Sequence, residues 1–437
     1  MAGGTWTSQN KVRPGVYIRF KSNDDYRMTI GERGVVAVCL SLSWGPYSKI
    51  MTITPDMDTT ALLGHPISEI FELREMFKGT NRTGGPKKIL LMRASATGDA
   101  AAAVTTGNLT ATAKYNGTLG NKIKIVITAN LDSTFTVDTV YDSKIMDTQI
   151  GATVSDLTDN DWVAFTGSGA LAATAGASLT GGLDGTLATT AHSTFLTRLE
   201  GQDFDIVLYA GSDSTTKSAY AAFAVRMADE CGKYCQAVID GLGSGSRFVI
   251  RYQGGNVILD GSAVNPIYWL AGAEAGAQYN ESLTYAIYPG VESVQVPKTN
   301  DQIINAINQG LLILTDSNSG VRVETDINSL TTYTQDIGAV YRKNRVMRLC
   351  NSLANDIYQQ FADNFIGVVT NNESGRERLK AAIVGYMIQL QRGEGIRDFS
   401  PNDVEVLPGE SIDAVVINLA FYALDAVEKI YMTVTVS

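Results

Sequence analysis

The sequence contains little of what enzymes and metal sites are usually built from. Among its 437 residues are two histidines and four cysteines, with no HExxH, G-x-S-x-G, Walker or EF-hand spacing. His65 and His192 have no carboxylate or cysteine at motif spacing. Cys231 and Cys235 have the i,i+4 spacing of half a metal site. No histidine lies near them, so we interpret them as small buried hydrophobic residues. We therefore predict a protein that is not an enzyme and needs no metal or cofactor.

Positive charge and long apolar runs are scarce as well. The formal net charge of −10 argues against direct binding to nucleic acid, because neutralising phosphates requires a basic surface. No apolar run approaches the length of a membrane span, and the N-terminus lacks the basic-then-apolar order of a signal peptide. We expect a protein that is made in a cytoplasm and does not insert into a membrane.

Alternating strand and helix patterns predict an α/β domain in two parts, residues 33–104 and 186–320. The predicted strands are 34–42, 87–92, 204–210, 236–240, 256–260 and 311–315, and the predicted helices are 67–77, 214–233, 266–277 and 301–309. Residues 211–214 form a turn before a helix, where an anion can bind, but an N-cap role for Asp213 or Ser214 is simpler.

Residues 105–185 differ in residue pattern from the segments on either side. Helical periodicity is almost absent, and short alternating runs at 122–128, 135–141 and 162–165 are separated by turn residues. We interpret this segment as a small β domain inserted into the α/β domain, and we expect it to be self-contained.

The C-terminal part, residues 321–437, is predicted to be an α+β domain. An amphipathic helix at 341–366 is followed by a second helix, which a capping box from Ser374 to Glu377 opens. Strands follow at 404–407, 414–421 and 430–436. The strand at 414–421 is apolar on both faces and therefore predicted to be buried.

Both ends of the chain have strand patterns without an assured partner. At the C-terminus Ile430, Met432, Val434 and Val436 alternate with Tyr431, Thr433 and Thr435. At the N-terminus, an arm at residues 1–32 contains a short strand at 15–20 with Val16, Tyr17 and Ile18. The C-terminal strand needs a partner, and 414–421 is the nearest candidate within the chain. Two such ends favour strand exchange between neighbouring copies.

Basic residues crowd the starts of the two C-terminal helices, where the helix dipole disfavours positive charge. They are Arg342, Lys343, Arg345 and Arg348 in the first helix, and Arg376, Arg378 and Lys380 in the second. One interpretation is a solvated face paired with Asp336 and Glu377. The other is a surface that meets an acidic partner.

Short motifs in a characteristic order span nearly the whole chain. They are RPGVYI at 13–18, GERGVV at 31–36, SWGP at 43–46, AKYNGTLGN at 113–121, LTGGLDG at 179–185, DINSL at 326–330, KNR at 343–345, FIG at 365–367, NNESGR at 371–376 and VEKIYM at 427–432. With these motifs the sequence resembles the tail sheath proteins of contractile bacteriophages, of the kind found in phages and prophages of Gram-positive bacteria.

The resemblance implies a structural subunit that polymerises as helical stacked rings around a tail tube and contracts to drive the tube through the bacterial envelope. It also implies that the terminal segments add strands to the C-terminal domains of neighbouring copies, and that this domain faces the tube. The seven basic residues are then candidates for contact with the tube. The implied partners are further copies of the chain, the tail tube protein, and baseplate and tail terminator proteins, in a virion tail assembled in the host bacterial cytoplasm.

Other functional classes remain open from the sequence alone. A contractile bacteriocin or another injection machine would use the same kind of sheath. An α/β enzyme or a carbohydrate-binding module, with the Thr- and Gly-rich insertion binding sugars, is the remaining alternative.

Overall fold

The computed structural model describes residues 2–4, 15–17, 28–241, 243 and 245–436. The chain divides into two compact units, Met1–Ile30 with Asp356–Tyr422 and Gly31–Asn355 with Ala423–Ser437. This division falls inside the long helix α7 (Asn344–Asn364) and not at the predicted boundary at residue 321. Ile18 of the predicted N-terminal strand lies outside the described residues.

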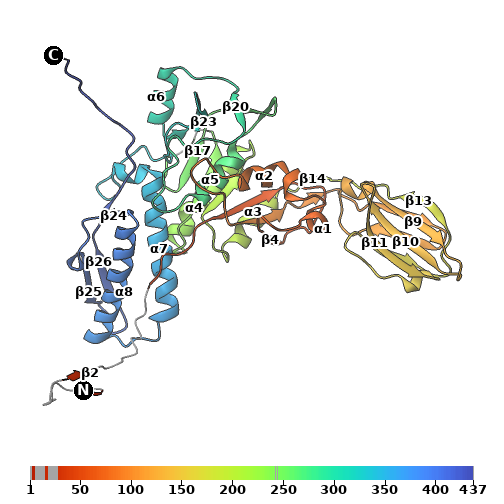
Figure 1. Ribbon diagram of the computed structural model, residues 1–437, viewed down its shortest axis with the longest axis horizontal. Helices are drawn as coiled ribbons and strands as arrows, with labels where there is room; N and C mark the ends of the chain where they lie inside the picture. The colour runs from red at the N-terminus through yellow and green to blue at the C-terminus, as the bar shows by residue number, and fades with distance from the viewer. Residues whose placement is uncertain (1, 5–14, 18–27, 242, 244, 437) are drawn as a thin grey trace. The chain divides into compact units, whose positions relative to one another are not determined.

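The larger unit contains a seven-stranded sheet with the strand order β21-β17-β16-β15-β3-β5-β4. Figure 1 labels two of its strands, β17 and β4. All neighbouring strands are parallel except β4, which runs antiparallel at one edge. The strands are β3 (Val35–Leu40), β4 (Ile50–Ile53), β5 (Lys88–Arg93), β15 (Ile206–Tyr209), β16 (Gln236–Asp240), β17 (Val249–Tyr252) and β21 (Leu311–Leu312). This confirms the predicted α/β organisation.

Helices cover both faces of this sheet, which is why its strands are apolar throughout. Alternate residues of β3 point to opposite sides: Val36 and Val38 join the core beneath α2 and α5, while Ala37 and Cys39 join the core beneath α3 and α4. The helices are α1 (Thr60–Leu63), α2 (Phe71–Phe77), α3 (Ala191–Leu199), α4 (Ser214–Asp229) and α5 (Ile267–Gly276). Asp213 caps α4 by accepting from the Thr216 amide, as the simpler interpretation of that turn predicts.

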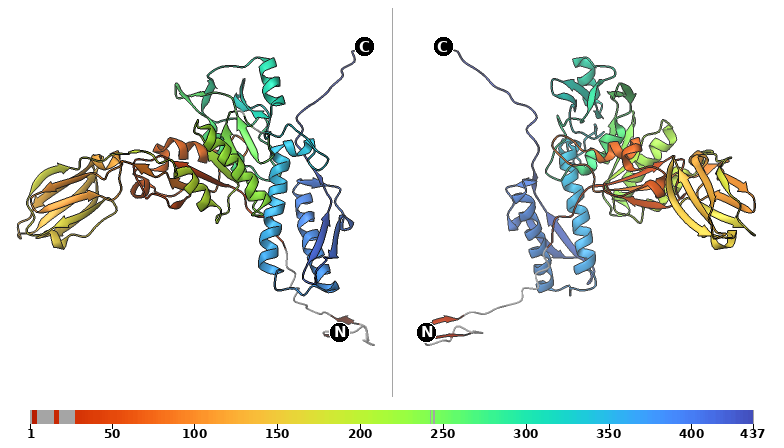
Figure 2. Two further views of the ribbon diagram at one scale, coloured as in Figure 1. Left: turned by 180° about the vertical axis from the view of Figure 1, so that it is seen from behind. Right: turned by 45° about the vertical axis from the view of Figure 1, so that its right-hand side comes forward.

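The segment predicted as a β domain forms two sheets packed face to face (Figure 2). One sheet has the order β11-β10-β9-β13 and the other β12-β8-β7. The strands are β7 (Ala103–Thr106), β8 (Leu109–Ala113), β9 (Ile123–Ala129), β10 (Phe135–Tyr141), β11 (Lys144–Gly151), β12 (Val163–Gly167) and β13 (Thr174–Ser178). Two short paired strands, β6 (Ala96–Thr97) and β14 (Thr186–Leu187), connect this β-sandwich to the α/β part.

The expectation that the insertion is self-contained is wrong in one respect. Trp44, which belongs to the α/β part, is fully buried in the core of the β-sandwich. Its ring stacks on Trp162 with 5.5 Å between centroids and meets Tyr115 edge-on at 5.2 Å. The two parts therefore share a hydrophobic core at their junction.

Smaller elements complete the larger unit. A three-stranded sheet has the order β19-β18-β20, and β22 pairs with β23. The elements are β18 (Val257–Leu259), β19 (Ser262–Val264), β20 (Val291–Val294), α6 (Asn300–Asn308), β22 (Leu314–Ser317) and β23 (Gly320–Val323). The strand predicted at 311–315 is thus divided between the central sheet and a hairpin.

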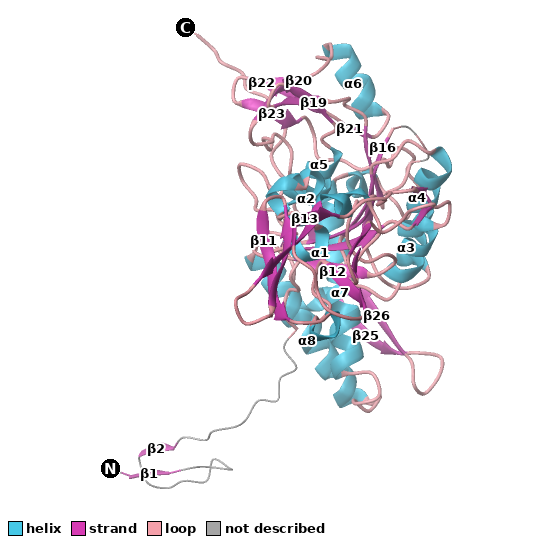
Figure 3. Ribbon diagram, turned by 90° about the vertical axis from the view of Figure 1, so that its right-hand side faces the viewer, coloured by secondary structure: helices cyan, strands magenta, loops and turns pink. Residues whose placement is uncertain are grey.

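The smaller unit packs helix α8 (Glu373–Arg392) against the hairpin of β25 (Val404–Pro408) and β26 (Val415–Leu419), as Figure 3 shows. The predicted apolar face of α8, Leu379, Ile383, Met387 and Leu390, is buried. Short pairs join β1 (Ala2–Gly4) to β2 (Gly15–Tyr17), and β24 (Ile396–Arg397) to β27 (Tyr422–Ala423).

Both C-terminal helices begin differently from the prediction. α7 starts at Asn344, after a single 3₁₀ turn at Ala339–Arg342, so Arg342 and Lys343 precede the helix. α8 is capped by Asn372, whose side chain accepts from the Gly375 amide, and not by Ser374.

Candidate functional site

The C-terminal arm, which we define as residues 424–436, is the most exposed apolar segment that the structure describes. It contains no helix or strand, and from Lys429 onwards each described residue is exposed (Figure 1). Ile430, Met432, Val434 and Val436 are between 70% and 89% exposed. The predicted strand at 430–436 therefore has no partner in its own chain among the described residues, including β26.

The hairpin β25–β26 is exposed as well. Val415 and Val416 follow each other in β26 and point to opposite sides of the hairpin, yet they are 39% and 48% exposed. The prediction of a buried strand at 414–421 is wrong for the single chain, because no residue of β26 is buried. A two-stranded hairpin with open edges and apolar faces is suited to receive a further strand.

Arg348 occupies the opposite environment from the one predicted. Its side chain is fully buried between two carboxylates, with Nη1 2.6 Å from Glu274 Oε2 and Nη2 2.5 Å from Asp326 Oδ2. Nη2 also donates to the Glu281 carbonyl oxygen at 2.7 Å, and Asn344 donates to Glu274 Oε1 at 3.1 Å. Arg348 cannot meet a partner protein from this position, and it is withdrawn as a tube contact.

The two carboxylates beside Arg348 differ in their preferred ionisation. Burial, and then the charge of Asp326, raises the pKa of Glu274 well above its ordinary value. Burial also acts against ionisation of Asp326, but the Arg348 charge and the Leu283 amide outweigh it and keep the pKa of Asp326 below its ordinary value. The Arg348 charge thus favours the ionised form of Asp326, whereas burial and the neighbouring Asp326 favour the protonated form of Glu274.

The other basic residues near α7 are also engaged within the chain. Arg345 is only 9% exposed. Arg342 donates to the Ile307 carbonyl oxygen. Lys343 forms an ion pair with Glu428 of the C-terminal arm. Arg345 is therefore withdrawn as a tube contact because it is buried, whereas a tube contact by the partly exposed Arg342 and Lys343 stays a prediction.

The basic residues of α8 lie closer to the prediction, but they do not share one face. Arg378 lies on the exposed stripe of α8, while Arg376 and Lys380 are half-buried on the other side of the helix. Arg376 donates to Asn371 Oδ1 at 3.1 Å. Arg378 is consequently the basic side chain of this group that is most available to a partner.

The junction between the α/β part and the β-sandwich is closely packed. Buried Arg93 donates to the carbonyl oxygens of Leu42, Gly45 and Asn116 at 2.6–2.8 Å. Asp184 accepts from both the amide and the hydroxyl of Thr118. Three motifs of the resemblance, at 43–46, 113–121 and 179–185, meet here.

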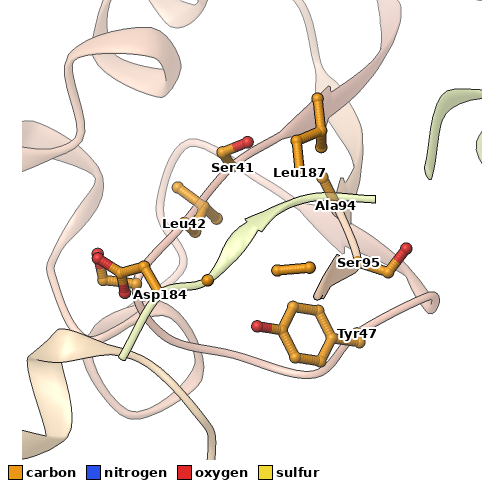
Figure 4. Close-up of a pocket in the computed structure, with 10 residues that line it drawn as sticks. Ser41, Leu42, Tyr47, Ala94, Ser95, Asp184 and Leu187 are labelled. Carbon is orange, nitrogen blue, oxygen red and sulfur yellow. The ribbon is translucent and has the colours of Figure 1, made fainter. Parts of the chain in front are cut away.

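A cavity of about 120 Å³ lies beside this junction, with Ser41, Tyr47, Asp184 and Leu187 around it (Figure 4). Only glycine fits at position 117 of this junction, because a Cβ there would lie 2.0 Å from the Ser43 carbonyl oxygen. The cavity is about the size of a few water molecules, and its lining includes no group prepared for chemistry.

The titratable groups near β3 and β15 are not activated for catalysis. Burial raises the pKa of the Cys39 thiol to about 12 and lowers the pKa of His192, whose Nδ1 lies 2.9 Å from the Tyr220 hydroxyl. His65 does have a carboxylate nearby, contrary to the sequence interpretation: Glu69 Oε2 lies 3.0 Å from its Nδ1. Within the described ranges, no group of three or more metal-binding side chains forms a site, and no helix is long and apolar enough to cross a membrane.

Comparison with known proteins supports the sheath interpretation. Family models of the phage tail sheath match in order along the chain: the domain III N-terminal region at residues 33–83, the β-sandwich domain at 96–184, the central domain at 185–329 and the C-terminal domain at 336–437. The crystal structure of the sheath tail protein from Desulfitobacterium hafniense is 37% identical in sequence. It has a TM-score of 0.85 and covers 96% of this chain and 99% of its own. The chain belongs to the phage tail sheath family.

Other relatives agree with this assignment. The phage-like element PBSX protein XkdK of Bacillus subtilis is 32% identical over the full length of both chains. The sheath of an extracellular contractile injection system in its contracted state shares the fold, at 15% identity and a TM-score of 0.57. The chain is accordingly a structural tail sheath subunit, and proteins that share its fold form helical sheaths.

Sequence reasoning missed Glu428, at the base of the C-terminal arm of this tail sheath protein, and its partner Thr284. Glu428 accepts from Lys343 through one carboxylate oxygen and from the Thr284 hydroxyl, at 2.7 Å, through the other. The sequence places Glu428 beside the alternating apolar residues. Its partners are 85 and 144 positions away, and no local pattern indicates them.

Proposed function

We propose that neighbouring sheath subunits are joined by exchange of their terminal segments. Each C-terminal arm adds its strand to the β25–β26 hairpin of another copy, and the N-terminal segment, with Val16, Tyr17 and Ile18, does the same. The observation that carries this proposal is that the arm's alternating apolar residues and the apolar residues of the β25–β26 hairpin are both exposed. Pairing the two would satisfy the backbone groups of the arm and cover both apolar surfaces together.

Further partners follow from this arrangement. The smaller unit, with Arg378 on the exposed stripe of α8, lies against an acidic surface of a tail tube protein. Small residues along that stripe, such as Ala381 and Gly385, allow close approach of the tube. Baseplate and tail terminator proteins cover the two ends of the polymer, and assembly takes place in the cytoplasm of the host bacterium before the tail joins its particle.

Paired substitutions within the arm test strand exchange. Met432→Lys with Val434→Lys should abolish sheath tubes, because both side chains enter the apolar face of the shared sheet. Thr433→Lys with Thr435→Lys, the matched control on the alternate face, should still give tubes. Deleting residues 430–437 should act like the first pair and leave the monomer folded, since the arm is exposed there. Electron microscopy of purified protein measures all three. Equal numbers of tubes from both lysine pairs would contradict the proposal.

The tube contact is tested by single charge reversals in α8. Arg378→Glu should reduce the number of tube-filled extended sheaths when the chain is co-expressed with its tube protein. Lys380→Glu, the control on the half-buried side of the helix, should not. Individual exposed ion pairs contribute only about 0–1 kcal/mol, but every subunit of the polymer repeats them. Normal filled sheaths from Arg378→Glu would remove this residue from the proposed contact.

A further inference from the structure

The exposure of the C-terminal arm changes abruptly after Glu428. Glu428 is 15% exposed at its side chain, whereas the residues described after it are exposed throughout. The arm therefore has a bound root and a free end. The position of this boundary decides how far the free end can reach and from which point it starts.

The root is bound through the Glu428 carboxylate. Lys343 donates to Oε2, and the Thr284 hydroxyl donates to Oε1 at 2.7 Å. Asp425 adds a second carboxylate 3.9 Å from Lys343 Nζ. Hydrogen bonds between charged groups are roughly twice as strong as neutral ones, and partial burial protects this pair from screening by salt.

The two residues that receive Glu428 are themselves fixed by the interior of the unit. The Thr284 hydroxyl accepts from the Asp326 amide at 2.9 Å, which directs its proton towards Glu428. Lys343 forms a β-bridge with Ile327, next to Asp326 in the chain. The Asp326 side chain in turn binds the buried Arg348. The receiving site is therefore prepared before the arm binds it.

We infer that Lys343 and Thr284 form a clasp for Glu428, which fixes the point where the C-terminal arm leaves the subunit so that only the residues after it reach a second copy of this chain. This inference rests on the proposed strand exchange and adds a positioning role to it. Residues 429–437 span roughly 30 Å when extended, which is the reach left to the exchanged strand. An arm released from the clasp would search a larger volume, and its effective concentration at the neighbouring hairpin would fall.

The clasp is first tested in the monomer. Trypsin cleaves after Lys429, and this cut requires mobile chain on both sides of the bond. Glu428→Ala, Lys343→Met and Thr284→Val should each speed the release of the 430–437 peptide, and roughly tenfold is expected for the charged pair. Glu230→Ala, which removes an exposed carboxylate at the end of α4, is the matched control and should leave the rate unchanged. Release at the wild-type rate from all three clasp variants would overturn the inference.

Assembly supplies the second test. Lys343→Glu and Glu428→Lys should each raise the protein concentration needed for polymer formation roughly tenfold. The double variant, which restores the pair with exchanged charges, should bring this concentration back towards the wild-type value. Failure of the double variant to recover, with both single variants folded, would overturn the clasp.

The outcomes separate this inference from the proposed function. If deletion of residues 430–437 abolishes polymers while the clasp variants assemble at the wild-type concentration, strand exchange stands and the clasp is wrong. If the deletion variant assembles normally, both are wrong.

Discussion

At the scale of single residues, the buried group around Arg348 is where sequence and structure differ most. A run of basic residues at 342–348 predicts an exposed surface, because charged residues are rarely buried without partners. The partners here are Glu274 on α5 and Asp326 before α7, at sequence separations of 74 and 22. The sequence shows the charge but not the two carboxylates that make its burial possible.

Removing the Arg348 charge should be strongly destabilising. Arg348→Met leaves Asp326 ionised in the interior without its counter-ion, and we expect a loss of about 3–5 kcal/mol in the free energy of unfolding. Arg378→Met, on the exposed stripe of α8, is the control and should change it by less than about 0.5 kcal/mol. Chemical denaturation followed by circular dichroism measures both. Similar small losses would show that the Arg348 network is not a stabilising unit.

Glu274 gives this network a predictable dependence on pH. Since its pKa is raised in the folded state, the folded chain holds a proton that the unfolded chain loses above the ordinary pKa of 4.5, so this residue lowers stability as the pH rises. Glu274→Gln imitates the protonated form. Relative to the wild type, the variant should therefore be more stable at about pH 8 than at about pH 5. The same stability difference at both pH values would show that Glu274 is ionised in the folded chain.

At the scale of elements, local patterns predicted strands whose residue pattern reflects their own burial, and failed where distant packing decides how a run is used. The strand at 135–141 matches β10, because its alternation reflects one buried face. The apolar sequence at 311–315 does not indicate that its first residues join the central sheet and its last residues join a separate hairpin. Residues 430–436 have a strand pattern but form no strand in the single chain, and the proposed exchange between copies would supply the missing partner.

The shared core around Trp44 yields a prediction at this scale. Trp44→Ala should cost about 3–5 kcal/mol, because it removes a fully buried ring that packs against Trp162 and Tyr115. Replacing residues 98–185 with a short linker should also lower the melting temperature of the remaining α/β part, as it exposes Trp44. Adding Trp44→Ser to that deletion should recover part of the loss. Calorimetry checks this, and an unchanged melting temperature in the deletion variant would indicate independent cores.

At the scale of the whole molecule, the sequence identified the function better than it identified the contacts. Motifs spread along the chain indicated a sheath subunit, and the family matches confirm that assignment. Two of the seven residues first selected for tube contact, Arg345 and Arg348, are buried. Function at this scale is encoded in the whole chain, whereas an interface depends on which side chains the fold leaves outside.

The free end of the arm also makes the polymer open to interference. A synthetic peptide of residues 429–437 carries the same alternating pattern and, under strand exchange, occupies the receiving hairpin without bringing a subunit with it. Such a peptide acts as a decoy that ends growth, so sheath length should shorten as its concentration rises. The peptide with lysine at positions 432 and 434 should be inert. Under the proposed exchange, the sequence of the exposed arm is therefore also the sequence of an inhibitor of sheath growth.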